Sequence, residues 1–187
     1  MADRTHEQAR ITQAQPFDQT TLAQIYDTYQ LPLYRYIYRR VGDVETARDL
    51  TADVFKRLLQ AVHKGQEPDK NAIRAWLYRT AHNQVVDYYR RQQHRRHLPL
   101  FDSVVSTADD PVETAEHNIA AAAVRQAMQQ LTPDQQQVVS LKFLEGFTNQ
   151  EIADILDKPV GAVKSLQHRA LAALQRQLLP KREGELV

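Results

Sequence analysis

Apolar side chains recur every three or four residues along nearly the whole chain, and this spacing limits the fold more than any other feature. It matches the period of an amphipathic α-helix, whose apolar residues lie on one face. A β-sandwich with frequent turns is excluded, because the 187 residues include only 5 glycines and 8 prolines. The sequence therefore predicts an all-α protein.

Two helices are expected before residue 65. The first covers about 22–41, and Pro32 is predicted to bend it or to restart it. The second opens at Asp43, a residue type that caps helix N-termini, and ends near Gly65, which can take the left-handed conformation. The first apolar stripe consists of Leu22, Ile25, Tyr26, Tyr29, Leu33, Ile37 and Val41. The second helix has Val44, Ala47, Leu50, Val54, Leu58 and Val62 inside, with Phe55 and Leu59 beside them, and Glu45, Arg48, Asp49, Asp53, Lys56 and Arg57 on the opposite face.

A third helix is expected over 72–93, after a loop at 65–71. Its other faces mix aromatic and cationic side chains, which is the chemistry that captures single-stranded nucleic acid: arginines hold phosphates, and rings stack on unpaired bases at about 1–3 kcal/mol each. The alternative places Trp76 and some tyrosines in the core and the arginines in solvent, and for Trp76 alone the core is favoured. The core stripe is Ile73, Leu77, Ala81 and Val85, and the other faces carry Arg74, Tyr78, Arg79, His82, Asn83, Tyr88, Tyr89, Arg90 and Arg91.

The formal net charge of +1 hides an uneven distribution. Residues 71–97 carry six arginines against Asp87, a net of +5, whereas residues 98–124 carry five acids and no lysine or arginine, a net of −5. This arrangement suits a polyanion-binding surface followed by an acidic connector, although a solvated helix end beside an acidic loop is the commoner arrangement. Residues 98–111, with two prolines and three aspartates, are predicted to be a flexible linker.

The helical period returns after the linker. An Ala-rich helix is expected over 112–131, and Thr132 then caps another, with proline at its first position and Gln135 completing a capping box. The apolar residues of that helix, which is expected to end at Gly146, are Val138, Val139, Leu141 and Leu144.

Residues 148–170 carry the strongest local signal. A capping box of Thr148 and Glu151 opens a short helix, a turn follows at 157–159, and a longer helix covers about 160–178. This order predicts a helix-turn-helix, which presents its second helix to the DNA major groove, although a plain helical hairpin is commoner. The residues expected inside are Ile152, Ala153, Ile155 and Leu156, then Val163, Leu166, Ala170, Leu171 and Leu174. The outward residues, suited to phosphates and base edges, are Lys164, Ser165, His168 and Arg169.

Catalytic and metal-dependent functions have little support. The absence of cysteine excludes Cys-ligated zinc, iron–sulfur clusters and a thiol nucleophile. Asp49 and Asp53 share a helix face, but exposed acids are more often solvated or paired with a partner's cations, and the arginines around His94 and His97 repel a cation. We expect no metal and no cofactor. No membrane span or secretory signal is found, so a cytoplasmic protein is expected.

Three groups of motifs together resemble the sigma-70 family of RNA polymerase sigma factors, in its extracytoplasmic-function (ECF) group. The resemblance covers about residues 17–97 and 120–178. Residues 49–55 (DLTADVF) are similar to region 2.2, residues 75–83 (AWLYRTAHN) and 87–91 (DYYRR) to regions 2.3 and 2.4, and residues 131–133 (LTP), 148–153 (TNQEIA) and 160–165 (VGAVKS) to region 4.

The resemblance implies a promoter-specificity subunit that is not itself an enzyme. Region 2 would bind the clamp helices of core RNA polymerase and the minus-10 element, with loop 64–72 holding a flipped base. Region 4 would bind the polymerase flap and the minus-35 duplex of promoter DNA, and the linker would run towards the active-centre and RNA-exit channels. An anti-sigma factor is a further family expectation. The implied contacts are Asp49, Leu50, Asp53 and Phe55 with polymerase; Trp76, Arg79, Asn83, Tyr88, Arg90 and Arg91 with minus-10 DNA; and Lys164, Ser165, His168 and Arg169 with minus-35 DNA.

The chain departs from the family pattern in two places. Ala52 stands where the family often has glutamine, and Leu166-Gln167 stand where it often has arginine followed by a large aliphatic residue. The stripe through Val163 and Ala170 predicts that Leu166 is buried and that Gln167 turns outward, so the minus-35 sequence bound by this chain is expected to be atypical.

The predicted organisation is two small helical domains joined by a flexible acidic linker, the second with a helix-turn-helix. The boundaries are a tail at 1–14, region 2 at 15–97, the linker at 98–111, region 4 at 112–179 and a tail at 180–187. Two rival functions remain open. A helix-turn-helix repressor or activator would not need the Trp–Arg helix or the acidic helix face, and polymerase binding distinguishes it. A helical metal hydrolase is distinguished by metal analysis.

Overall fold

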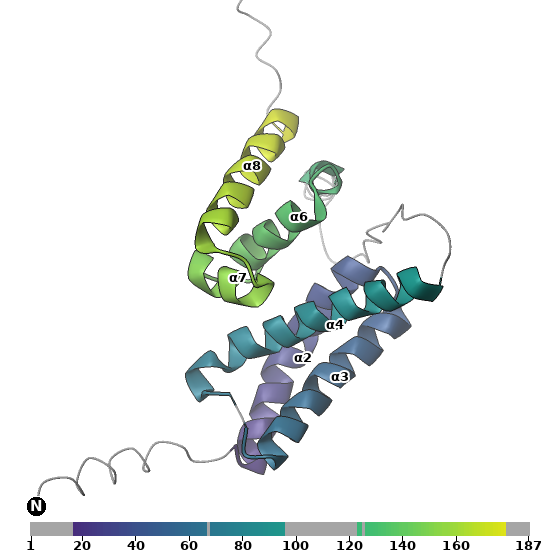
Figure 1. Ribbon diagram of the computed structural model, residues 1–187, viewed down its shortest axis with the longest axis vertical. Coiled ribbons are helices and arrows are strands. Elements are labelled where there is room, and N and C mark those ends of the chain that lie inside the picture. The colour runs from purple at the N-terminus through teal and green to yellow at the C-terminus, as the bar shows by residue number, and fades with distance from the viewer. Residues whose placement is uncertain (1–16, 67, 96–122, 125, 179–187) are drawn as a thin grey trace, which may run out of the picture. The chain divides into compact units, whose positions relative to one another are not determined.

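The computed structural model describes residues 17–66, 68–95, 123–124 and 126–178 (Figure 1). In those ranges the regular elements are all helical, which confirms the expected all-α class. The chain divides into two compact units, residues 1–103 and 104–187. The predicted linker at 98–111 lies outside the described residues, as does most of the helix expected over 112–131. Residues 123–124 and 126–129 of that helix are helical.

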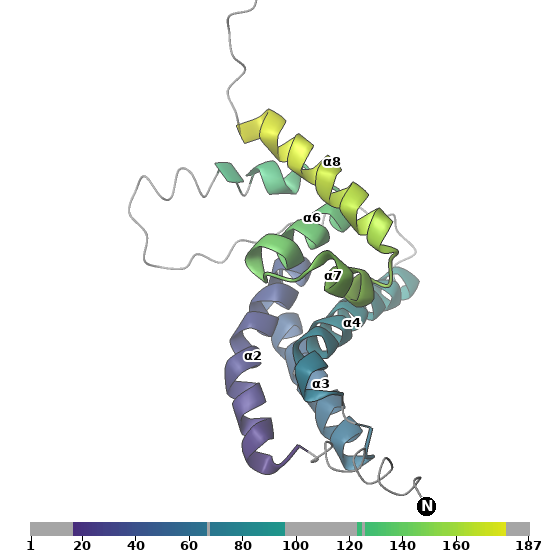
Figure 2. The same ribbon diagram turned by 90° about the vertical axis from the view of Figure 1, so that its left-hand side faces the viewer.

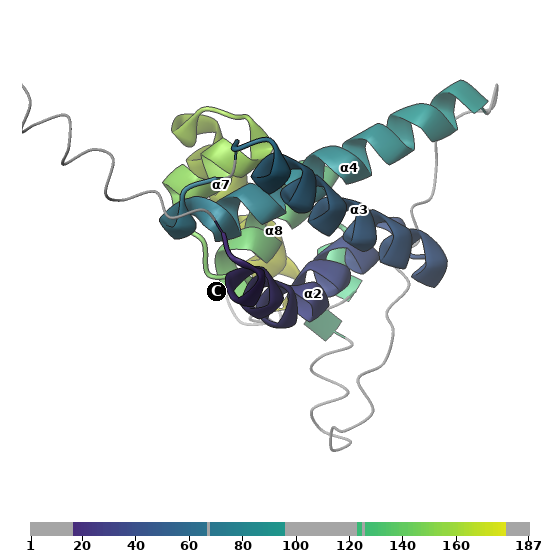
Figure 3. The ribbon, with the colours of Figure 1, turned by 90° about the horizontal axis from the view of Figure 1, so that it is seen from below.

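Three long helices form the first unit. They are α2 (Gln19–Val41), α3 (Val44–His63) and α4 (Ile73–Arg95), with the short 3₁₀ turn η1 (Lys70–Ala72) before α4. Figure 2 shows α2 and α3 side by side, and every pair among the three helices is in contact. In Figures 1 and 3, α4 crosses the other two helices and its last turns extend past them.

The core of this unit lies where the three helices meet. Burying one aliphatic side chain fully contributes about 1.5–3 kcal/mol to the stability of the fold. The stripe of buried residues on each helix therefore fixes which face of that helix remains outside. The predicted stripe of α4 is confirmed. The buried residues include Leu33, Tyr36 and Ile37 of α2; Ala47, Val54 and Leu58 of α3; and Ile73, Leu77, Ala81 and Val85 of α4. Two residues expected inside, Tyr26 and Val44, are instead exposed, as is Leu59, which was expected beside the stripe.

Pro32 lies inside α2, so of the two predicted outcomes, a bend or a restart, the restart does not occur. A proline inside a helix removes one backbone hydrogen bond. Ile25 before it and Leu33 after it are both buried in the core, so the packing on each side keeps the two halves of α2 in one helix.

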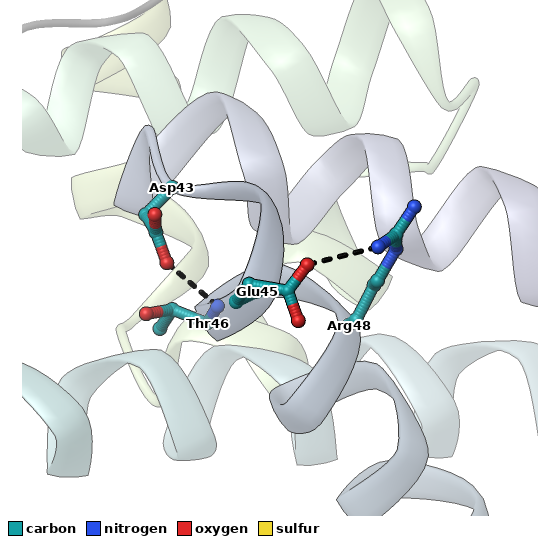
Figure 4. Close-up of polar contacts among 4 residues, drawn as sticks. All are labelled: Asp43, Glu45, Thr46 and Arg48. Atoms are coloured by element: carbon teal, nitrogen blue, oxygen red, sulfur yellow. Dashed lines mark hydrogen bonds and ion pairs between the residues drawn. The ribbon is translucent and has the colours of Figure 1, made fainter.

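Both ends of α3 are capped as predicted. At its start the Asp43 carboxylate accepts a hydrogen bond from the Thr46 backbone N–H at 2.7 Å, and Glu45 pairs with Arg48 at 2.9 Å (Figure 4). At its end Gly65 has φ of 65°, and the N–H groups of Gly65 and Gln66 donate to carbonyls of the last turn. This Schellman arrangement ends the helix where a side-chain-bearing residue would be strained.

Asp43→Ala should lower the thermal unfolding midpoint of the full chain, whereas Asp43→Asn should nearly preserve it, because asparagine also caps helices. The Thr46 hydrogen bonds lower the pKa of Asp43. Its charge therefore stabilises the fold above the unfolded-state pKa of about 4, and this contribution disappears as the pH falls through the lower folded-state pKa. Melting curves at neutral and acidic pH should show the difference between wild type and Asp43→Asn shrinking in acid. Equal midpoints for Asp43→Ala and wild type would contradict the capping role.

The second unit contains α6 (Pro133–Val139), the π-helical turn η2 (Ser140–Leu144), α7 (Asn149–Leu156) and α8 (Val160–Leu178). Both α6 and α7 pack on α8 (Figure 1). The predicted capping box at Thr132 is confirmed, with proline at the start of α6. The fully buried side chains of this unit include Val138, Leu141, Phe147, Ile152, Val163 and Ala170.

The π-helical turn changes which apolar residues face inward. The Glu145 N–H donates to the Ser140 carbonyl at 3.1 Å, a five-residue step that adds one residue to the turn. As a result Leu144, expected in the apolar set of this helix, is 59% exposed, and Phe147 is fully buried instead. Leu171 of α8, also expected inside, is 41% exposed.

Candidate nucleic-acid interface

The helix-turn-helix is formed by α7, a three-residue turn and α8. The capping box that opens α7 is confirmed: the Glu151 N–H donates to Thr148 Oγ1 at 3.2 Å, and the Thr148 N–H donates to Glu151 Oε2 at 2.7 Å. At the turn Asp157 takes the left-handed conformation with φ of 52°, and the Lys158 N–H donates to the Ala153 carbonyl at 3.0 Å. These bonds fix where α8 begins.

Packing and one ion pair hold the motif in place. The four residues of α7 predicted to lie inside are all buried, and Val163 and Ala170 of α8 are buried as well. Lys158 Nζ lies 3.0 Å from Asp134 Oδ2, so the turn is tied to the first turn of α6. The second helix is therefore held by α6 as well as by α7.

Four polar side chains share the outer face of α8. Lys164 and His168 are four residues apart, as are Ser165 and Arg169, so both pairs lie on one side of the helix. All four are exposed and together line a shallow, open depression. The Arg169 Nε–H donates to the Ser165 carbonyl at 3.3 Å, which holds the guanidinium along this face. The arrangement offers two permanent cations and two short hydrogen-bonding groups to one ligand.

Leu166 and Gln167 do not divide as the apolar stripe suggests. Both side chains are partly buried, whereas Leu166 was expected inside and Gln167 outside. The two residues therefore lie on opposite borders of the buried face of α8. The polar face formed by Lys164, Ser165, His168 and Arg169 is as predicted.

The outer face of α4 carries the second group of candidate residues. Arg79, Asn83 and Arg90 follow helical spacing away from the buried stripe and are exposed. Arg90 Nη2 lies 3.1 Å from Asp87 Oδ1 on the same helix. Trp76 is partly buried at the edge of this face, so neither the fully buried nor the fully exposed alternative holds for its ring. Arg91 is exposed and Tyr88 is partly buried, and Tyr88, three residues after Val85, continues the line of the buried stripe rather than the outer face.

Two tyrosines of α4 serve the core rather than the outer face. Tyr78, expected outside, is only 1% exposed, and its ring centroid lies 5.2 Å from that of Tyr36. The Tyr89 hydroxyl donates to the Arg40 carbonyl, and burial raises the pKa of this phenol above its ordinary value. Trp76, Tyr88 and Tyr89 are all partly buried, and of these rings only that of Trp76 borders the outer face of α4.

The charged face of α3 lies away from the core. Asp49 and Asp53 are exposed, one helical turn apart, and Leu50 beside them is partly buried. Phe55 is buried, with its ring centroid 4.9 Å from that of Tyr26, so a direct contact of Phe55 with a partner is not supported. Phe55 instead supports the α2–α3 packing. Spacing alone could not show this, because Phe55 lies at the border between the two faces.

One contact that the sequence did not reveal joins α2 to α4. Arg40 Nη1 lies 3.1 Å from His82 Nδ1 and donates to the Tyr36 hydroxyl at 3.4 Å. The Tyr89 hydroxyl also donates to the Arg40 carbonyl. Both the backbone and the side chain of Arg40 therefore contact α4. The only sequence signal was the run YRYIYRR at 34–40, in which arginines and tyrosines alternate around an isoleucine.

The described residues contain no group of three His, Asp or Glu side chains that could hold a metal ion. Among the described helices none is long and apolar enough to cross a membrane.

Comparison with known proteins gives two family matches. The family model Sigma-70 region 2 matches residues 25–95, and Sigma-70, region 4 matches residues 121–174. The ECF RNA polymerase sigma factor BldN of Streptomyces coelicolor is 33% identical over 176 residues, which is 91% of this chain and 64% of BldN. The ECF RNA polymerase sigma factor SigX of Bacillus subtilis is 31% identical, over 87% of this chain and 86% of SigX.

Solved structures with the same fold include two protein complexes. RpoE of Bartonella quintana, bound to the anti-sigma factor NepR, matches with a TM-score of 0.69 at 19% identity, over 86% of this chain and 98% of RpoE. CnrH, in complex with the cytosolic domain of CnrY, matches with a TM-score of 0.60 at 21% identity, over 95% of this chain and 97% of CnrH.

Proposed function

Since this chain belongs to the ECF group of the sigma-70 family, whose members direct promoter-specific transcription initiation and are not enzymes, we propose that its two units bind core RNA polymerase and the two elements of a promoter. The unit of α2–α4 is region 2, and the unit of α6–α8 is region 4. The observation that carries the proposal is the exposed polar face of α8 in a helix-turn-helix that packs on α6.

Region 4 binds the minus-35 element as duplex DNA. A recognition helix enters the major groove with its N-terminal residues, and here Lys164 and Ser165 lie in the second turn of α8 with His168 and Arg169 one turn later. Lysine and arginine bind guanine edges or phosphates, and serine and histidine add short hydrogen bonds. The ion pair between Lys158 and Asp134 supports this role, because it holds the start of α8 against α6.

Region 2 binds the minus-10 element as an opened strand. The outer face of α4 combines a reachable aromatic ring, Trp76, with Arg79, Asn83 and Arg90 on the same side. Extruding a base costs a few kcal/mol, which stacking and polar contacts must recover. Loop 64–72, just before α4, is the place for the extruded base. Its described residues are mostly exposed, and Asp69 accepts from the Asn71 N–H at 2.7 Å, which shapes the entry to the helix.

The acidic face of α3 binds the clamp helices of polymerase. Asp49→Arg should weaken polymerase association about fivefold, because an exposed charge pair is worth up to about 1 kcal/mol and the variant replaces attraction with repulsion. Competition between labelled wild type and each variant for core polymerase measures the effect. Asp27→Arg, the same reversal at an exposed position of α2, is the matched control. Unchanged affinity for Asp49→Arg, or equal losses for both variants, would contradict the docking assignment.

An anti-sigma partner also fits this chain. The RpoE structure contains an anti-sigma factor bound to a protein of the same fold. A protein that covers α3 or α8 would block the binding of polymerase or DNA. Co-expression with a captured partner should therefore prevent run-off transcription by the reconstituted holoenzyme.

The experiment that tests the whole function is run-off transcription with core polymerase on genomic DNA, which maps the promoters. Failure to start RNA at any defined site would contradict it.

A further inference from the structure

The run 34–40 of α2 contains three tyrosines and three arginines in seven residues, and the polymerase and minus-10 contacts proposed above use none of them. No acidic residue occurs in α2 after Asp27. The last turns of this helix therefore carry basic side chains with no acidic residue of the same helix beside them. The inward and outward residues of this run have different surroundings and are described in turn.

The inward residues face α4. Tyr36 is 2% exposed and packs its ring on Tyr78, and Arg40 Nη1 lies 3.1 Å from His82 Nδ1. Positions 36 and 40 thus define the side of α2 that contacts α4. Leu33 and Ile37, both fully buried, define the adjacent side that contacts the core.

The next positions around α2, continuing from the core through the α4-facing side, are Arg35 and Arg39. Each precedes an α4-facing residue by one position and so lies about 100° further round the helix. Arg35 is exposed and Arg39 is partly buried. Both arginines therefore lie on the solvent side of the seam where α2 meets α4.

The same step on α4 leads to Arg79 and Asn83. Tyr78 and His82 face α2, and each is followed by a residue that lies about 100° further from the core. Arg79 and Asn83 are exposed, on the side of α4 that borders the seam. The contacts pair position 36 with 78 and position 40 with 82, so the two helices run in the same direction here and their outer residues are at matching heights.

We propose that Arg35 and Arg39 extend the nucleic-acid surface of α4 across this seam and hold phosphates of the DNA strand that α4 engages. The proposal rests on the minus-10 role of α4 given above. Arginine binds phosphate through charge and its planar donor fork, and a phosphate contact strengthens binding without reading sequence. The arginines of α2 thus add affinity for DNA, and base selection is left to α4.

The test uses holoenzyme assembled from the full chain and core polymerase, with promoter DNA at a series of salt concentrations. Arg35→Gln combined with Arg39→Gln should lower promoter affinity about tenfold and make the slope of log K against log salt less steep by about 1.4–1.8, the value for two lost phosphate contacts. The loss should be equal for promoters that differ in minus-10 sequence, and polymerase affinity should be unchanged.

Three controls make the outcomes distinct. Lys56→Gln combined with Arg57→Gln removes two exposed charges from α3 and should leave DNA affinity unchanged. Arg35→Lys combined with Arg39→Lys keeps the charge and should retain most of the affinity, which separates phosphate binding from a folding defect. Arg79→Gln tests the minus-10 role of α4: if it lowers affinity while the α2 variant does not, the seam is wrong and the α4 role stands. If Arg79→Gln is also silent, the proposed region 2 function fails with it.

Two further results would overturn the proposal. A loss confined to one promoter sequence would indicate a base contact rather than a phosphate contact. A rise in DNA affinity when the arginines are removed would indicate that the seam holds an acidic protein segment.

Discussion

Lys164→Ala combined with Arg169→Ala should lower minus-35 duplex affinity of the holoenzyme at least about thirtyfold. The two cations lie on the exposed face of α8, in the first half of the helix that we propose enters the groove with its N-terminal residues. A good contact to a base or phosphate is worth about 1–3 kcal/mol, so two lost contacts amount to roughly 2–6 kcal/mol. Fluorescence anisotropy with a minus-35 duplex, and run-off transcription from a promoter that requires this element, measure the loss.

Polymerase binding by the same variant should stay at the wild-type level, because the acidic face of α3 is in the other unit. Arg176→Ala is the control on the same helix: it removes an exposed arginine two turns beyond Arg169, past the part of α8 that is proposed to reach the groove. A polymerase-binding defect in the double variant, or an equal DNA defect in Arg176→Ala, would show that the face of α8 has been assigned wrongly.

Phe147→Ala should unfold region 4 in most molecules at 37 °C while region 2 remains folded. Phe147 is fully buried, and removing such a ring costs about 3–5 kcal/mol, a large share of the stability of a small unit. Amide hydrogen exchange followed by NMR measures each unit separately, and protection should be lost in α6–α8 and kept in α2–α4.

Phe143→Ala is the matched control, because Phe143 lies four residues earlier and is 54% exposed. It should change protection by less than about a fifth of the Phe147→Ala effect, since an exposed ring loses little buried area. Equal effects would mean that the π-helical turn does not separate these two rings. Loss of protection in both units for Phe147→Ala would show that the units do not fold independently.

The sequence was most informative where one residue type has one local role. Three helices are capped as predicted, by Asp43, Thr132 and Thr148. Each cap accepts a hydrogen bond from a backbone N–H of its own helix, so the cap depends only on residues within one turn. The buried stripe of α4 was also predictable, since four apolar residues at helical spacing leave only one inward face. The helix-turn-helix follows from the same local signals.

The errors occur where distant packing overrides local pattern. Pro32 should interrupt a helix in isolation, but the buried residues on both sides of it hold α2 together. Tyr78 has a polar group and a position next to the core stripe, so only the partner ring of Tyr36 shows that it is buried. The π-helical turn exposes Leu144 and buries Phe147 through a single inserted residue, which spacing cannot reveal in advance.

The candidate site shows the same division. The exposure of Lys164, Ser165, His168 and Arg169 was predictable from the stripe of α8, and so was the exposure of Asp49 and Asp53. The burial of Phe55 was not, because it depends on Tyr26 of another helix. The roles of these residues in binding stay predictions until polymerase and DNA affinities are measured.

The contacts of Arg40 have a thermodynamic consequence for how region 2 meets its ligand. One residue donates towards His82 and Tyr36 and accepts from Tyr89, so the crossing of α2 over α4 is set within the free protein. A surface preorganised in this way loses little conformational entropy when it captures a strand, and more of the gross contact energy appears as affinity. Loosening that junction would therefore weaken the proposed strand capture, even though none of its three partner side chains is among the proposed nucleic-acid contacts.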